Sequence, residues 1–158
     1  MPVEILDGAI GTELLARGLA ASGPRWTARA AIDSPELLAA VHSDYARAGA
    51  TLHTANTFRT QPGAFGAGWQ EALNAAVRIA RQSTRANQRV AGSIAPVADC
   101  YRPDLSPGEG ARDEHRQVAT ALAEAGCEVL LCETFANEAE ALVAAEEAVR
   151  TGLPAWLS

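Results

Sequence analysis

Short apolar runs alternate with segments of helical periodicity along the whole chain. The apolar runs are bounded by turn-forming residues, and we expect parallel strands at residues 3–6, 51–56, 89–94, 128–134 and 155–158. The segments between them repeat apolar positions every three or four residues, as amphipathic helices do. This alternation is typical of βα units around a parallel sheet and predicts an α/β fold.

Capping residues predict where two of the longer helices begin and end. Ser34-Pro35 supplies an N-cap and a proline at the first helical position, and Gly49 ends that helix. Asn137, with Glu140 three residues later, resembles a capping box for a helix that reaches Arg150. Further helices are expected around residues 12–17, 73–80 and 118–125, and irregular segments at 20–32, 59–68 and 97–109.

Composition narrows the class of protein and its partners. The 158 residues are 48% hydrophobic and 20% charged, as in one ordinary domain spanning residues 1–158. The net charge of −6 argues against nucleic acid or an anionic membrane as partner. Residues 1–11 have neither a basic region nor a long apolar stretch, so we expect a cytoplasmic protein without a membrane span.

The first candidate site follows the first expected strand, at residues 7–12. Asp7 could meet a cation such as an ammonium group, while Gly8 and Gly11 would let backbone N–H groups approach a carboxylate. The alternative is a plain strand-to-helix turn in which Asp7 caps the helix. Chemistry is expected at this end of the strands because parallel α/β folds build their sites there.

Two more strand ends carry polar groups. Strand alternation puts Thr54 and Asn56 on one face, where they could orient a ligand or merely cap the strand. Glu133 ends the most apolar run, where an acid is costly to bury unless a cation or donor meets it. With Asp7 it could hold an α-amino group; the alternative is an exposed strand-end glutamate.

Cysteine and histidine offer little further chemistry. Cys127 and Cys132 are five residues apart and face opposite sides of an extended strand, and Cys100 lies alone in a loop, so we expect no disulfide framework and no zinc site. The histidines have no pattern of partners suited to general-base catalysis, and we expect packing or surface roles for His42, His53 and His115.

Taken together, these segments resemble the homocysteine S-methyltransferase family, which includes betaine-, S-methylmethionine- and folate-using enzymes. The matching pieces run in family order: DGAIGTEL at 7–14, HSDYARAGA at 42–50, TANTF at 54–58, GSIAP at 92–96 and EAGCEVLLCETFANEAEA at 124–141. The resemblance implies a (β/α)₈ TIM barrel of about 250 residues or more, of which this chain covers about four and a half βα units.

The resemblance also implies a substrate site. Asp7 and Glu133 would hold the amino group of homocysteine, and its carboxylate end would meet Gly8, Ala9, Ile10, Thr54, Asn56 and Thr57. The family's zinc, which turns the thiol into a thiolate nucleophile, is held by three cysteines expected beyond Ser158. We therefore expect no zinc on this chain.

Three functions stay open on the sequence. The first is the N-terminal half of a methyltransferase that makes methionine from homocysteine and S-methylmethionine, S-adenosylmethionine, betaine or a folate. The second is a non-catalytic half-barrel that binds an amino acid weakly or only self-associates through exposed sheet edges. The third is an unrelated barrel enzyme that uses Asp7 and Glu133 as an acid/base pair. We expect no methyl transfer by this chain alone.

Overall fold

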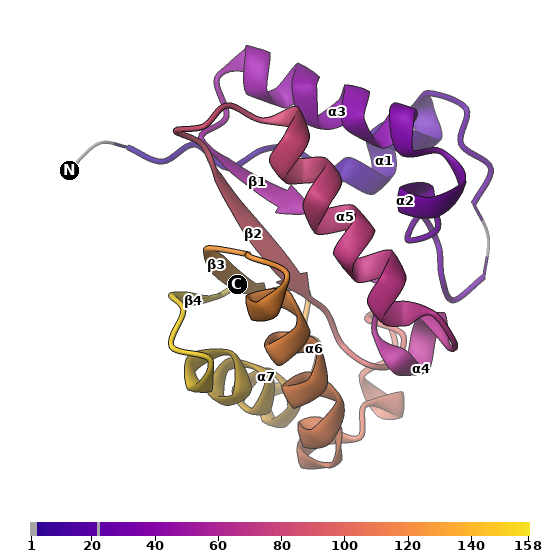
Figure 1. The fold of residues 1–158 in the computed structure, drawn as a ribbon. Helices are drawn as coiled ribbons and strands as arrows, with labels where there is room; N and C mark the ends of the chain where they lie inside the picture. The colour runs from indigo at the N-terminus through magenta and orange to yellow at the C-terminus, as the bar shows by residue number, and fades with distance from the viewer. Residues whose placement is uncertain (1–2, 22) are drawn as a thin grey trace.

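The computed structural model describes residues 3–21 and 23–158, and its centre is a parallel four-stranded sheet with the order β1-β2-β3-β4 (Figure 1). Consecutive strands are neighbours, with Thr54 opposite Ala91 and Ser93 opposite Leu131. The strands are β1 (Leu52–Ala55), β2 (Arg89–Ile94), β3 (Val129–Cys132) and β4 (Ala155–Leu157).

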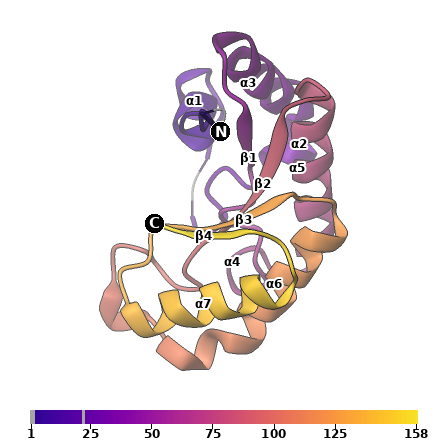
Figure 2. The ribbon, with the colours of Figure 1, turned by 90° about the vertical axis from the view of Figure 1, so that its left-hand side faces the viewer.

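Helices connect the strands and cover one side of the sheet. In Figure 2, α3, α5, α6 and α7 form an arc along that side. The α-helices are α1 (Ile10–Ala16), α2 (Ala30–Asp33), α3 (Pro35–Ala48), α4 (Pro62–Phe65), α5 (Trp69–Ser83), α6 (Arg112–Glu124) and α7 (Glu138–Arg150), with 3₁₀ turns η1 (Pro103–Leu105) and η2 (Gly108–Ala111). Among the described residues, none of these helices is long and apolar enough to cross a membrane.

The main core lies between the sheet and these helices. Alternate strand residues such as Val90, Ile94 and Leu130 pack against Leu73 of α5 and Leu122 of α6, and each is at most 1% exposed. Each such side chain contributes about 1.5–3 kcal/mol through burial. A smaller cluster of Leu52, Ala91 and Val129 forms on the opposite face. The helix-covered face of β2 and β3 is thus apolar along its length, and the opposite face is apolar only at the start of the strands.

The prediction of a full strand at residues 3–6 is wrong. Only one bridge forms, between Leu6 and Leu52, although the Ile5 carbonyl also accepts the N–H groups of Thr51 and Leu52. Strand pairing ends here because the Asp7 carboxylate accepts the Thr54 N–H. If the strand continued, a backbone carbonyl would accept that N–H instead.

Other local expectations need smaller corrections. The segments expected to be irregular contain the short helices α2 and α4 and the two 3₁₀ turns, and the fourth expected strand is regular only over Val129–Cys132. The Asn137 side chain caps α7 by accepting the Glu140 N–H at 3.1 Å. The reciprocal half of the capping box is absent from the described residues, because the Glu140 carboxylate bonds to Val97 and Ser106 instead.

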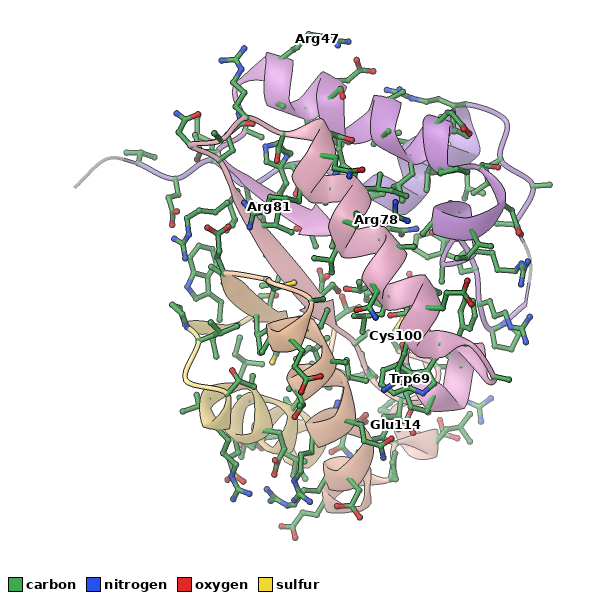
Figure 3. The ribbon with its side chains drawn as sticks, viewed as in Figure 1. Arg47, Trp69, Arg78, Arg81, Cys100 and Glu114 are labelled. Carbon is green, nitrogen blue, oxygen red and sulfur yellow. The ribbon has the colours of Figure 1, made fainter. Side chains whose placement is uncertain are left out.

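Charged side chains join successive units at the outer surface. Arg81 near the end of α5, labelled in Figure 3, contacts Glu128 just before β3 at 2.6 Å. Glu114 of α6, also labelled, accepts the backbone N–H of Gly63 in α4 at 2.8 Å. The Glu114 contact holds the segment after β1 against α6 at the carboxyl ends of the strands, whereas the Arg81 contact joins α5 to the residue before β3 at their amino ends.

Candidate functional site

A cavity of about 1020 Å³ opens at the carboxyl ends of the strands. It is bounded by the turn before α1, the ends of β1, β2 and β3, and the segment after β2. The described lining includes Asp7, Gly8, Ala9, Ile10, Thr54, Asn56, Arg59, Ser93, Val97, Tyr101, Leu131, Glu133 and Thr134. Seven of the eight residues expected at the substrate site therefore line one cavity, and Thr57 is absent from the described lining.

Asp7 reaches this cavity from the extended segment before α1. Its two carboxylate oxygens accept the Thr54 N–H at 3.1 and 3.0 Å, and its side chain is only 1% exposed. Burial raises the pKa of Asp7 to about 7, the hydrogen bonds from Thr54 oppose that rise, and the charge of Glu133 adds to it. The alternative in which Asp7 caps α1 is wrong, because the N-cap is Ala9 and no side chain caps that helix.

Glu133 lies at the end of β3 on the face that carries Thr54 and Ser93. Its carboxylate accepts the Ser93 hydroxyl at 2.5 Å, and burial raises its pKa while that hydrogen bond opposes the rise. The following residue, Thr134, has a positive φ of 66°, which is unusual for a β-branched side chain. Such strain is concentrated at functional sites, and Thr134 lines the cavity.

The two glycines of the first turn have a different physical role from the one expected. A Cβ on Gly8 would lie 2.6 Å from the hydroxyl oxygen of Tyr45, and a Cβ on Gly11 would lie 2.2 Å from the Trp26 ring. Close packing of these aromatic side chains therefore accounts for both glycines. The backbone of Gly8, Ala9 and Ile10 still borders the cavity, so ligand approach at this turn remains a hypothesis.

Asn56 and Thr57 have side chains that are already bonded within the protein. The Asn56 amide donates to the Thr27 carbonyl at 2.9 Å. The Thr57 hydroxyl donates to the Ser93 carbonyl and accepts the Ser93 N–H, both at 2.9 Å. These bonds hold the ends of β1 and β2 together, so any contact of Thr57 with a ligand would have to use its backbone.

Arg59 and Ser93 are cavity residues that the sequence analysis did not single out. The Arg59 guanidinium donates to the carbonyls of Pro96 and Ala98 and lies 5.1 Å from the centre of the Phe58 ring. It thereby fixes the segment after β2 over the cavity. Strand alternation alone could have placed Ser93 beside Glu133, whereas Arg59 acts through carbonyls that are distant in sequence.

The cysteines do not fit the thiolate zinc site that the family resemblance implies. Cys127 and Cys132 are buried in the core, where burial raises the pKa values of both thiols to about 12. Neither belongs to the group of potential metal ligands found among the described residues. Cys100 lies in the segment after β2, with its sulfur 3.8 Å from Arg59. Described cysteines thus supply no converging set of thiolates.

The histidines are all buried, so a surface role is wrong for each of them. His115 lies 3.3 Å from the Glu140 carboxylate, away from the cavity. His42, His53 and Asp7 each offer one ligand atom, and these three atoms lie within 4.8 Å of one another. The described residues therefore contain one group suited to a metal ion, and it includes no cysteine.

Comparison with known proteins decides the family. Residues 4–158 match the family model described as homocysteine S-methyltransferase. The chain belongs to this family. It is 36% identical over 179 residues to homocysteine S-methyltransferase of Escherichia coli and 33% identical over 170 residues to homocysteine S-methyltransferase YbgG of Bacillus subtilis. The alignments cover 98% and 90% of this chain but 57% and 54% of those relatives, so the chain spans just over half their length.

Solved structures of the family confirm the fold. The metallated form of the homocysteine methyltransferase MmuM from Escherichia coli superposes with a TM-score of 0.87 at 31% identity, covering 100% of this chain and 63% of that one. The apo form of the same enzyme superposes with a TM-score of 0.76 at 29% identity. The α/β expectation and its assignment to part of a TIM barrel are both confirmed, and an unrelated barrel enzyme is excluded.

Proposed function

We propose that this chain forms the homocysteine-binding part of a homocysteine S-methyltransferase that makes methionine. The observation that carries the proposal is the pair of acids at one cavity, Asp7 and Glu133, neither of which has an Arg partner among residues 3–21 and 23–158. Buried carboxylates without a cation are costly, and an ammonium group of the substrate would offset that cost.

The rest of the amino acid would extend across the same cavity. The backbone of Gly8, Ala9 and Ile10 and the segment of Thr54, Asn56 and Thr57 are proposed to meet its carboxylate end. The apolar lining, including Leu131, suits the short side chain that leads to the sulfur. In this proposal Asp7 and Glu133 orient the substrate, and Ser93 positions Glu133 through its hydroxyl.

Zinc and the methyl donor belong to the proposed function of the whole protein. A bound zinc ion would lower the pKa of the homocysteine thiol and so supply the thiolate nucleophile. A metallated relative supports a metal in the family. We propose that the zinc ligands, and the contacts to S-methylmethionine, S-adenosylmethionine, betaine or a folate, lie in the part of the family barrel that this chain does not span. The cytoplasm is the proposed location.

The test of substrate binding is the substitution Glu133→Gln, which removes the charge and keeps the shape. We expect at least a tenfold loss of affinity for homocysteine and for methionine by calorimetry, about 1.4 kcal/mol, since the ammonium loses one of its two acids. Glu138→Gln, an exposed position on α7, is the matched control and should bind as the unchanged chain does. Equal affinity of both variants would discard the proposed role of Glu133.

A second test concerns catalysis. We expect no methyl transfer to homocysteine by the 158-residue chain, because no cysteine belongs to the one group of potential metal ligands among the described residues. The measurement is methionine formation with each donor in the presence of zinc. Turnover that depends on zinc and stops with a chelator would show that this chain alone is an enzyme.

A further inference from the structure

Three potential ligands meet between α3 and the sheet. His42 comes from α3, His53 from β1, and Asp7 from the segment before α1. His53 alternates with Thr54 along β1 and so points away from the cavity face, toward the helices. One atom from each of the three residues lies within 4.8 Å of the other two, and His53 Nδ1 is 3.9 Å from Asp7 Oδ2.

Both imidazoles are buried without hydrogen-bond partners. Each histidine is 0% exposed, and none of the four ring nitrogens has a partner among the described residues. An unpaired polar group in the interior costs about 1–3 kcal/mol, and four such atoms in one place are rare in a native core. A ligand that these nitrogens can bind would explain why the polar rings lie there.

We propose that Asp7, His42 and His53 bind a divalent transition-metal ion. Two imidazole nitrogens and one carboxylate oxygen suit Zn²⁺, Co²⁺ or Ni²⁺, and the buried position excludes competing water. Ligands of a tetrahedral zinc ion lie about 3.3 Å apart for bonds of about 2.0–2.1 Å. Binding therefore requires the three side chains to move together by about an ångström. This site contains nitrogen and oxygen ligands only, unlike the family's thiolate site.

The proposed metal would compete with the proposed substrate at Asp7. A carboxylate bonded to a divalent cation attracts an ammonium group less strongly. We expect the zinc-loaded chain to bind methionine at least threefold more weakly than the metal-free chain. Metal binding itself is measured without any amino acid, so failure of the metal site and failure of the substrate site give separate results.

The experiment is zinc binding by the whole chain. After removal of metal with a chelator, equilibrium dialysis against Zn²⁺ with metal analysis should give one ion per chain. Zinc X-ray absorption should show a first shell of nitrogen and oxygen at about 2.0–2.1 Å. His53→Ala should weaken binding at least tenfold, whereas His115→Ala, at an equally buried histidine outside the cluster, and Cys100→Ser should retain it.

Several outcomes would overturn the inference. These are no bound zinc in the unchanged chain, sulfur in the first shell, and binding that His53→Ala leaves intact. If His53→Ala fails to fold by circular dichroism, His53→Asn serves as the second variant, and the absorption spectrum of the unchanged chain decides the ligands without any variant.

Discussion

At the scale of single residues, Glu140 illustrates how a buried acid can be held by distant partners. One carboxylate oxygen accepts the Val97 N–H at 2.8 Å and lies 3.3 Å from His115, and the other accepts the Ser106 hydroxyl. Burial raises the pKa of Glu140, but the bonds to His115, Ser106 and Val97 outweigh it and hold the pKa below the usual value. Glu140 therefore anchors both ends of the segment that borders the cavity after β2.

This network predicts a pH-dependent effect of Glu140→Gln. A carboxyl group whose pKa is depressed by folding stabilises the protein above its unfolded pKa, and that contribution is lost as pH falls through the folded value. We expect the variant to lose about 1–3 kcal/mol of unfolding free energy at pH 7 and less below about pH 4. Urea unfolding at both pH values is the measurement, with exposed Glu138→Gln as control. A loss independent of pH would contradict the ionised role.

At the scale of elements, the contact between β2 and α6 depends on the absence of a side chain. A Cβ at Gly92 would lie 2.8 Å from Leu122 and 3.0 Å from the sulfur of Cys127, all within the core. Contacts this short force neighbouring side chains to move. Gly92 therefore lets the helix pack directly on the strand, which keeps the end of β2, including Ser93, in register with β3.

We expect Gly92→Ala to lower the unfolding free energy by about 1–3 kcal/mol through overpacking. Gly110→Ala is the control, because its Cβ would meet only Pro107, at an ordinary 3.6 Å. Removing the clash with Leu122→Ala should reduce the cost of Gly92→Ala in a double-mutant cycle. Additive effects of the two substitutions would show that the Leu122 contact is not the cause.

At the scale of the whole molecule, both edges of the described sheet expose apolar side chains. Trp156 and Leu157 of β4 are 38% and 50% exposed, and Val3 and Ile5 beside β1 are 82% and 53% exposed. Open strand edges of this kind pair readily with other chains. We therefore keep the proposal that isolated copies of this chain self-associate through their sheet edges.

The corresponding test places a charge on each edge. Ile5→Lys and Leu157→Lys should shift sedimentation toward the monomer at high protein concentration, because a lysine on an edge strand opposes strand pairing. Leu142→Lys is matched in exposure, at 52%, but lies on helix α7. If all three variants behave alike, or if the unchanged chain is already monomeric, edge pairing is not the mode of association.

The sequence alone determined the order of the four sheet strands and the longer helices, the parallel α/β class and the strand ends that border the cavity. These follow from local periodicity and capping, and alternation placed Thr54, Leu131 and Glu133 at a face that lines one cavity. Only the tertiary structure decided which distant groups meet: Glu140 with the segment after β2, and His42 with His53 and Asp7. Asp7 is separated from His42 by 35 residues and from His53 by 46, and Glu140 is 43 residues from Val97. A burial pattern specifies the face on which a side chain lies but not the group it meets there.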